Sequence, residues 1–396
     1  MTGFADLGVP ARVSDALTSR GITTPLPIQS AAIPDGIAGR DVCGKAKTGS
    51  GKTLAFGIPL VMRAAEGKPR RPGALILVPT RELASQVADE LRPIGAALDR
   101  TVAVAYGGTS LEQQARAIEK GVDVLVATPG RLIDLIERKV ADLSNVRVLT
   151  VDEADRMADM GFLPQVQWVL RHVPKGVQTF LFSATLDGAV GALARDLTDP
   201  VRHEVADGTG ATVTTMAHRF LLVHQMDKGR VAAAVAEGVD RMIVFCATKR
   251  GCDRVARDLR ELGVGATAIH GDLRQNDREK ALAAFAEGRR PVLVATDVAA
   301  RGIHVDDVDC VLHWDPPATS KDYLHRSGRT ARAGSVGLAV TLLLWNEELA
   351  ARSLIRQLRL QDPIVEVMSN HPHLRDLASW EPTTQDAVGW TPSRAG

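Results

Sequence analysis

Short apolar runs rich in Val, Leu and Ile alternate with longer helical stretches along almost the whole chain. This alternation is typical of parallel strands joined by crossover helices. The runs are too continuously apolar to expose one face to water, so helices are expected on both faces of each sheet. The sequence therefore predicts an α/β fold with mostly parallel sheets. The predicted strands are residues 41–43, 74–78, 101–105, 122–127, 146–151 and 179–182, then 220–223, 242–246, 265–269, 291–295, 308–313 and 336–344.

The alternation breaks once, where the chain becomes rich in Gly, Thr and Ala without apolar periodicity, and it then begins again. We place a linker there, at residues 207–217, between an α/β domain at 1–206 and a second one at 218–361. After residue 361 the chain has scattered prolines and more acidic than basic side chains. Residues 362–396 are therefore predicted to be a short acidic, loosely ordered tail.

Charge and cysteine usage exclude several kinds of protein. Lys and Arg total 48 against 47 Asp and Glu, so the net charge of +1 cannot recruit a polyanion over the whole surface, and nucleic acid would need a local groove. The four cysteines form no C-x-x-C pair, which argues against a disulfide framework or a zinc site. No apolar run approaches the roughly 20 residues that cross a bilayer. We expect a soluble, cytoplasmic protein with no membrane partner.

A phosphate-binding loop is the strongest local motif. It spans Ala46, Lys47, Thr48, Gly49, Ser50, Gly51, Lys52 and Thr53, between a short predicted strand and a helical stretch. Small residues let successive backbone N–H groups converge on phosphate oxygens at a helix N-terminus. Lys52 would reach the terminal phosphates, and the Thr53 hydroxyl can ligate Mg²⁺. Ala46 stands where the strict motif has Gly, and a lone loop of this kind is sometimes only a turn.

A carboxylate cluster follows the apolar run 148–151 and supports the nucleotide interpretation. Asp152 is placed to hold Mg²⁺, largely through water, and Glu153 to polarise a water for in-line attack on a γ-phosphate. Surface acids at the start of a helix are the alternative, which fits any one of these residues but not the set. The sequence thus predicts an ATP site with bound magnesium.

Together with the loop, Asp152, Glu153, Ala154 and Asp155 resemble the DEAD-box family of ATP-dependent RNA helicases of superfamily 2, of bacterial type with a minimal core. The resemblance extends to about residue 361, with the family's motifs in order. It implies two tandem RecA-like domains, ATP and Mg²⁺ as ligands, and RNA held mainly by its backbone. It also implies that ATP and single-stranded RNA bind across a cleft between the domains, with local unwinding of short duplexes or remodelling of RNA–protein complexes.

The remaining first-domain motifs take their roles from this resemblance. Residues 21–29 are similar to the family's Q motif, with Leu26 at a position where a hydroxyl residue is more usual. Gln29 would read adenine, and Phe4 would pack on the base, although a plain hydrophobic anchor explains Phe4 equally well. Asp155, Ser183 and Thr185 would couple ATP state to unwinding. The residues matching the family's RNA contacts are Pro79, Thr80, Arg81, Gly107, Gly108, Thr128, Pro129, Gly130 and Arg131.

The second domain carries the later motifs. Arg329 and Arg332 match the arginines that act on the γ-phosphate, for which a planar and permanently charged guanidinium is suited. A solvated basic helix face formed by Arg326, Arg329 and Arg332 is the alternative. The other matching residues are Gly302 and His304 toward ATP, His325 for coupling, and Gly271, Gln275, Arg278 and Thr296 toward RNA; His304 stands where the family commonly has Asp.

Three other functions remain open at this point. The first is a translocating DNA helicase, which shares the two-domain architecture. The second is an ATP-dependent RNA clamp or scaffold with slow turnover, which binds the same ligands. The third is a generic P-loop ATPase, which leaves the second-domain motifs unexplained. The RNA itself is not readable from the sequence. Partners in ribosome assembly or RNA degradation are possible at the level of the family.

Overall fold

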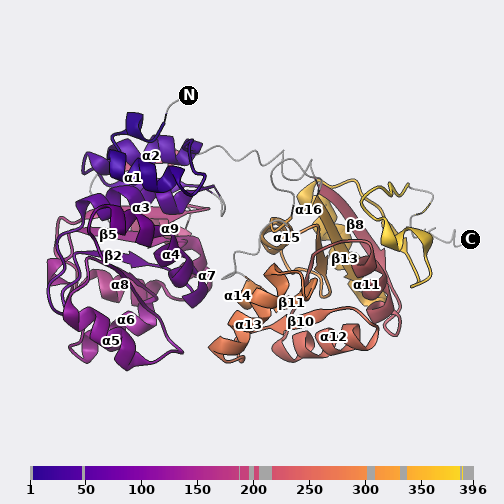
Figure 1. Ribbon diagram of the computed structural model, residues 1–396. Helices are drawn as coiled ribbons and strands as arrows, with labels where there is room; N and C mark the ends of the chain where they lie inside the picture. Colours follow the sequence, from indigo (N-terminus) through magenta and orange to yellow (C-terminus); the bar gives the residue numbers. More distant parts are fainter. Residues whose placement is uncertain are drawn as a thin grey trace, which may run out of the picture. The chain divides into compact units, whose positions relative to one another are not determined.

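The structure, a computed structural model, describes residues 3–46, 50–186, 188–195, 200–204, 216–300, 308–330, 337–383 and 386. The chain divides into two compact units, residues 1–207 and 208–396 (Figure 1). Lys47, Thr48, Gly49, Gly302, His304 and Arg332 lie outside the described residues. None of the helices in the described ranges is long and apolar enough to cross a membrane.

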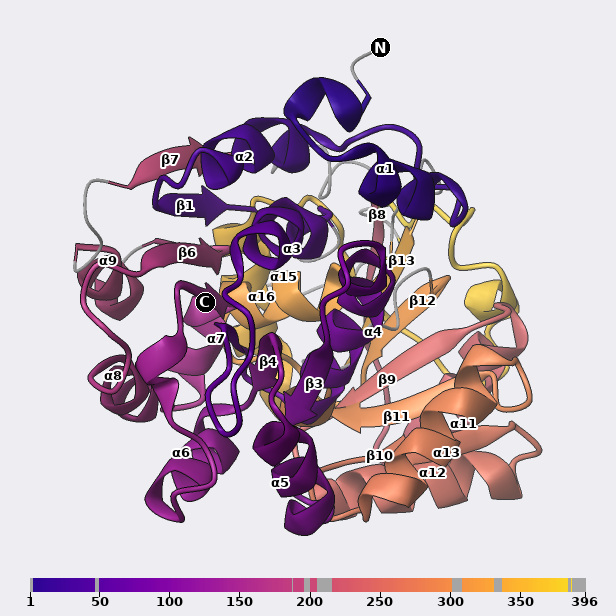
Figure 2. The same cartoon turned by 60° about the vertical axis from the view of Figure 1, so that its left-hand side comes forward.

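The first unit is built on a seven-stranded sheet in the order β3-β4-β2-β5-β6-β1-β7, in which every pair is parallel. Figure 2 shows β7, β1 and β6 as neighbouring arrows. This order needs crossovers, because strands that follow each other in the chain are not always neighbours. The strands are β1 (Val42–Lys45), β2 (Ala74–Leu77), β3 (Val102–Ala105), β4 (Val124–Ala127), β5 (Val148–Asp152), β6 (Gln178–Ser183) and β7 (Val201–Glu204).

Helices cover both faces of this sheet because its strands are apolar on both sides. Within β2, Ile76 belongs to the apolar cluster under the first four helices, and its neighbour Leu77 to the cluster under the later ones. The first face carries α1 (Ala11–Thr18), α2 (Pro27–Ile37), α3 (Lys52–Arg63) and α4 (Arg81–Ala97). The second carries α5 (Leu111–Lys120), α6 (Pro129–Glu137), α7 (Ala154–Asp159), α8 (Leu163–Leu170) and α9 (Gly188–Arg195).

The second unit repeats this plan, with a parallel sheet in the order β10-β11-β9-β12-β13-β8-β14. Counting from the first strand of each unit, the two orders are the same, so β8 corresponds to β1 and α11 to α3. The strands are β8 (Met216–Leu222), β9 (Met242–Cys246), β10 (Ala266–Ile269), β11 (Val292–Thr296), β12 (Cys310–His313), β13 (Gly337–Leu343) and β14 (Ile364–Glu366).

Two layers of helices also enclose the second sheet, as Figure 1 shows for α11 and α12 on one side and α13, α14 and α15 on the other. These helices are α11 (Lys228–Glu237), α12 (Lys249–Glu261), α13 (Gln275–Ala286), α14 (Asp297–Ala300), α15 (Ser320–Ser327) and α16 (Glu348–Leu358). Short 3-10 turns occur at η1 (Ala5–Leu7), η2 (Leu143–Asn145), η3 (Trp345–Glu347) and η4 (Pro372–Arg375). The predicted α/β fold with parallel sheets covered on both faces is confirmed.

The predicted tail is wrong over its first part. β14 pairs with β8, and four apolar side chains between residues 365 and 377 are buried in the second unit's core, namely Val365, Val367, Leu374 and Leu377. These side chains stand singly between polar and proline residues, so they produce no periodic signal. The second unit therefore continues well past residue 361. The sequence does not predict β7 either. This edge strand has no buried residue, and only every other residue is half-buried.

All four cysteines are free and buried, as expected from their spacing.

Candidate functional site

The carboxyl ends of the first unit's strands form one edge, because all seven strands are parallel. Along this edge, the neighbouring strands β5, β6 and β1 lead into the carboxylate cluster, the Ser183 segment and the phosphate loop. The neighbouring strands β3, β4 and β2 lead into the segments predicted to contact RNA. The fold thus gathers the motifs predicted to bind nucleotide on one half of this edge and the motifs predicted to contact RNA on the other. We call these the nucleotide half and the nucleic-acid half.

The described part of the phosphate loop is fixed at both ends. At its start, the N–H of Ala46 donates to the carbonyl of Ser183 at 3.0 Å. At its end, Gly51 has φ of 81°, a left-handed conformation that favours glycine, and Lys52 begins α3 with only 7% of its surface exposed. A Cβ at position 51 would lie 2.4 Å from Nε2 of Gln29. Ser50 and Thr53 adjoin these residues and are half-buried.

Gln29 connects the N-terminal segment to this loop. Its Oε1 accepts from the N–H of Leu26 at 2.8 Å, which caps α2, and its Nε2 donates to the carbonyl of Gly51 at 3.0 Å. The side chain is 2% exposed. The unusual Leu26 is accommodated because only its backbone takes part, while its side chain is 44% exposed. Reading of adenine by Gln29 stays a prediction.

Phe4 lies in the apolar core of the first unit and is 4% exposed. Its neighbours in that cluster include side chains of α1 and α2, so it anchors the N-terminal segment. Packing of Phe4 on a nucleotide base stays a prediction.

The carboxylate cluster is buried beside Lys52. Burial raises the pKa of Asp152 to about 6, with the charge of Lys52 opposing the rise and those of Glu153 and Asp155 adding to it. Glu153 has φ of 53°, which costs about 1–3 kcal/mol for a residue other than glycine. Its carboxylate is paired with Arg156. Strain at a buried acid beside a phosphate loop is typical of a functional position.

Ser183 links the carboxylate cluster to the segment that follows β6. Its Oγ accepts from the N–H of Asp155 at 3.2 Å and from the N–H of Thr185 at 3.3 Å. The serine is fully buried, so these contacts are shielded from water. Any displacement of α7, which carries Asp155, is therefore transmitted to residues 183–185.

The donor set beside the loop consists of oxygen atoms, which suits Mg²⁺ rather than a soft metal. Within the described ranges, no group of three or more His, Cys, Asp or Glu side chains is arranged to hold a metal ion. If Thr53 and Asp152 hold Mg²⁺ as predicted, most coordination positions are left to water and phosphate, which is usual for this ion.

In the nucleic-acid half, Arg81 lies against the two glycines that follow β3. A Cβ at Gly108, whose φ is 83°, would lie 1.9 Å from Nη1 of Arg81, and one at Gly107 would lie 3.8 Å from Nη2. Thr80 caps α4 by accepting from the N–H of Leu83 at 3.3 Å, and Pro79 precedes it. Glycine is thus favoured at position 108, where the arginine crosses the loop, whereas position 107 has room for a side chain.

Gln114 is a residue of this half that the sequence did not reveal. Its Oε1 accepts from Nη1 of Arg131 at 2.8 Å, and its Nε2 donates to the carbonyl of Tyr106 at 2.9 Å and to Oγ1 of Thr109 at 2.8 Å. Arg131 also donates to the carbonyl of Thr109 at 3.3 Å. One buried amide therefore holds Arg131 against the loop of Gly107 and Gly108. Arg131 itself follows Thr128, Pro129 and Gly130 at the start of α6.

In the second unit, the segments predicted to contact RNA follow β10 and β11, which are neighbours. A Cβ added to Gly271 would lie 3.7 Å from Cε of Lys249. Nζ of Lys249 pairs with Asp272 at 2.5 Å. Thr296 ends β11, and its Oγ1 accepts from the N–H of Ala299 at 3.4 Å. Gln275 and Arg278 occupy the first turn of α13, and Arg278 is buried.

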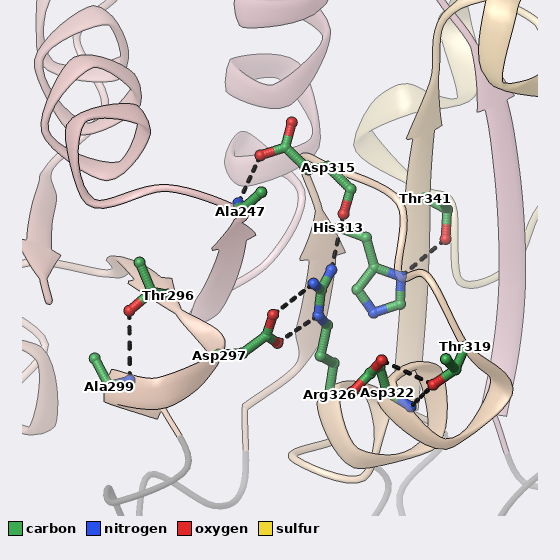
Figure 3. Close-up of polar contacts among 10 residues, drawn as sticks. All are labelled: Ala247, Thr296, Asp297, Ala299, His313, Asp315, Thr319, Asp322, Arg326 and Thr341. Atoms are coloured by element: carbon green, nitrogen blue, oxygen red, sulfur yellow. Dashed lines mark hydrogen bonds and ion pairs between the residues drawn. The ribbon is translucent and has the colours of Figure 1, made fainter. Parts of the chain in front are cut away.

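Arg326 of α15 is buried and is held in a bidentate ion pair with the half-buried Asp297, drawn in Figure 3. Its Nε and Nη2 donate to the two carboxylate oxygens of Asp297 at 2.6 and 2.7 Å, and its Nη1 donates to the carbonyl of Asp315 at 2.8 Å. Oδ2 of Asp315 in turn accepts from the N–H of Ala247 at 2.7 Å. Arg326 thus joins the ends of β11, β12 and β9.

The alternative of a solvated basic face on α15 is wrong for its described members. Arg326 is 5% exposed and Arg329 is 8% exposed, so neither guanidinium lies free on the surface. His325 is half-buried on the same helix. The Arg326–Asp297 pair fixes the helix that leads to Arg329, a role that the sequence did not single out.

The fold and the site define a two-domain protein of the helicase class. It has two parallel sheets of the same strand order, a phosphate-loop motif and buried acids on the first, and a buried arginine on the second. Family models described as DEAD/DEAH box helicase and helicase conserved C-terminal domain match residues 26–192 and 229–334. The chain is 39% identical to DEAD-box ATP-dependent RNA helicase 5 of Oryza sativa, over 92% of this chain and 73% of the relative. This chain belongs to the DEAD-box family.

The other comparisons agree with the fold. The chain is 40% identical to DEAD-box ATP-dependent RNA helicase 30 of Arabidopsis thaliana over 92% of its length, but spans only 63% of that relative. It is similar to the structure of S. cerevisiae Dbp5 bound to RNA and ADP BeF3, with a TM-score of 0.78, 26% identity, and coverage of 93% of this chain and 96% of that one. The predicted RecA-like domains are confirmed. The predicted bacterial type is not borne out, because these relatives are eukaryotic.

Proposed function

We propose that this protein is an ATP-dependent RNA helicase that hydrolyses ATP to ADP and phosphate, binds single-stranded RNA through its backbone, and locally unwinds short duplexes or remodels RNA–protein complexes. The observation that carries the proposal is the division of one sheet edge between a nucleotide half and a nucleic-acid half. Ligands that bind adjacent halves of one rigid edge can affect each other's affinity.

The nucleotide half supplies the groups that hydrolysis needs. Backbone N–H groups of the loop and Lys52 bind the phosphates, and Glu153 polarises the attacking water. Breaking the ion pair with Arg156 frees the Glu153 carboxylate for that task. Thr53 and Asp152 would hold Mg²⁺, which neutralises phosphate charge when bound. Arg329 and Arg332 stabilise charge on the γ-phosphate in the ATP-bound state.

The nucleic-acid half binds RNA with little sequence preference. Arg81, Arg131, the glycine loop and the N-termini of α4 and α6 present donors to a sugar–phosphate backbone. Gly271, Thr296 and the first turn of α13 are the second unit's contribution. Preference for RNA over DNA is proposed from the family, in which 2′-hydroxyl contacts make the distinction. Cytoplasmic location and partners in ribosome assembly or RNA degradation are proposed at the level of the family only.

Steady-state ATP hydrolysis tests this proposal. Rates are measured with no nucleic acid, with single-stranded RNA and with DNA of the same sequence, and Glu153→Gln serves as the control for contaminating ATPases. We expect stimulation by RNA alone, with loss of hydrolysis in Glu153→Gln. Equal stimulation by DNA would replace the proposal with a DNA helicase. Tight ATP-dependent RNA binding with negligible turnover would replace it with a clamp.

A further inference from the structure

Four large apolar side chains of the second unit are exposed just beyond the ends of three neighbouring strands. Trp345 and Leu349 follow β13 and are 57% and 83% exposed, Met226 follows β8 and is 86% exposed, and Met368 follows β14 and is 63% exposed. Since the sheet order places β13, β8 and β14 side by side, these residues belong to one region of the surface. We call it the strand-end patch.

Register and hydrogen bonds bring the four side chains together. Leu343 and Glu366 are both aligned with Leu222, so the three strands end level with one another, about 10 Å from first to last. Asp227 accepts from the N–H of Ser369 at 2.6 Å and from its hydroxyl at 2.8 Å, which ties the residue after Met226 to the residue after Met368. Trp345 begins η3 and Leu349 lies in the first turn of α16, which follows η3 directly.

Nothing in the fold or in the proposed mechanism requires this exposure. Single exposed apolar residues are ordinary, but four at one place, among them Trp and two Met, are typical of a surface that binds a protein partner. Flexible Met side chains adapt to the shape of the bound segment. The patch lies at the opposite end of the strand order from β10 and β11, whose ends carry the proposed RNA contacts.

The charges around the patch indicate the chemistry of the partner. The segments that carry it, residues 223–228, 344–349 and 366–369, contain the carboxylates Asp227, Glu347, Glu348 and Glu366. Their only cation is Lys228, which is 3% exposed and lies with its Nζ 5.2 Å from the ring centre of Trp314. Arg352 pairs with Glu348 at 2.7 Å. An acidic rim of this kind repels RNA and attracts basic side chains.

We propose that the strand-end patch is a docking site for a protein partner that presents an amphipathic segment with apolar anchors flanked by Lys or Arg. The apolar anchors contact Trp345, Leu349 and the two methionines, and the flanking cations face the carboxylates. Within the second unit, this site lies away from β10 and β11, so a partner bound there would leave the proposed RNA contacts at their ends free.

A synthetic amphipathic helical peptide with leucines on one face and lysines on the other is the probe. Its binding to the full chain is followed by fluorescence anisotropy at low and high salt, beside a peptide with glutamates in place of the lysines. The test variant carries Trp345→Ser and Leu349→Ser. The matched control is Val298→Ser, which removes an apolar side chain that is 56% exposed on α14, after β11 and away from the three strands of the patch. Circular dichroism checks that each variant folds.

We expect the lysine peptide to bind and to lose about tenfold or more in affinity in the double variant but not in Val298→Ser. We also expect binding to weaken with salt, and the glutamate peptide not to bind. Equal binding to all variants, or equal binding of the two peptides, would overturn the proposal. Dimerisation of the wild-type chain in sedimentation velocity that the double variant abolishes would assign the patch to a second copy. None of these readouts depends on ATP hydrolysis.

Discussion

The side-chain amide of Gln29 donates to the carbonyl of Gly51 at 3.0 Å, so the N-terminal segment and the phosphate loop share one hydrogen bond. The two residues are 22 positions apart in the chain, and the bond is partly buried, with Gln29 itself 2% exposed. Since Gln29 also caps α2, a change at the loop is felt at the start of that helix. Binding of nucleotide and order in the N-terminal segment are therefore coupled.

Gly51→Ala should disrupt nucleotide binding. The added Cβ would lie 2.4 Å from Gln29 Nε2 and 2.7 Å from Leu26 Cδ1, and φ of 81° adds strain, for a total cost of about 1–3 kcal/mol. Equilibrium binding of a fluorescent ATP analogue, with thermal unfolding alongside, measures both effects. Gly229→Ala is the control, because its Cβ would meet no atom nearer than Leu262 Cδ1 at 3.8 Å. Unchanged affinity in Gly51→Ala would contradict the geometry of the loop.

Gln114→Ala should weaken RNA binding while leaving chemistry intact. Without the amide, Arg131 loses its 2.8 Å bond and keeps only the carbonyl of Thr109. In RNA-stimulated ATP hydrolysis we expect the RNA concentration for half-maximal rate to rise several-fold, about 1 kcal/mol, with little change in kcat. Gln113→Ala is the matched control, since that neighbouring glutamine side chain is exposed. Equal effects of the two substitutions would mean that Gln114 does not position Arg131.

Asp297→Asn should destabilise the second unit more than the loss of a surface ion pair does. It leaves the buried guanidinium of Arg326 without its charged partner. Because the Asp297 side chain is 27% exposed, we expect a cost at the lower end of the about 3–5 kcal/mol that breaking a buried pair involves. Urea unfolding measures this cost. Asp258→Asn is the control, because its partner Arg257 is 60% exposed and such pairs contribute about 0–1 kcal/mol. A cost below that of the control would show that the pair is not structurally important.

His313 should make the folded state sensitive to mild acid. Burial lowers the pKa of His313 well below its ordinary 6.5, helped by the charges of Arg326 and His218, and its Nδ1 contacts Oγ1 of Thr341 at 2.9 Å. Because the folded state resists protonation of His313, the contribution of this residue to the free energy of unfolding is complete above pH 6.5. It falls by up to about 1.4 kcal/mol for each pH unit below it.

The free energy of unfolding of the wild type and of His313→Gln, compared between pH 7.5 and pH 5.5, tests this dependence. We expect the wild type to lose more stability on acidification than the variant does. His172→Gln, at an exposed histidine, should leave the wild-type slope unchanged. Parallel curves for wild type and His313→Gln would show that His313 does not set the acid sensitivity.

How much of this structure can be predicted from the sequence depends on whether the residues involved are close together in the chain. The strands and the groups at their ends, such as Asp152 and Lys52, lie in contiguous motifs, so their order predicts both the fold and the nucleotide half. Gln114 could not be found in this way, because its partners Tyr106 and Arg131 become neighbours only when β3 and β4 pair. The packing of residues 364–377 could not be predicted for a similar reason. Their apolar side chains are isolated in the sequence and are recognised as core residues only when they pack against β8 and α11.

The shared strand order places Lys228, the first residue of α11, at the position that Lys52 holds at the start of α3. The charge of Lys52 interacts with the Asp152 carboxylate, whereas the ammonium group of Lys228 lies over the indole ring of Trp314. The two units therefore share one backbone plan but differ around this lysine: in the first unit the preceding loop carries the phosphate-binding motif, and in the second an aromatic ring covers the lysine. The same position of one scaffold thus supports two different environments, set by the residues that surround it rather than by the sheet.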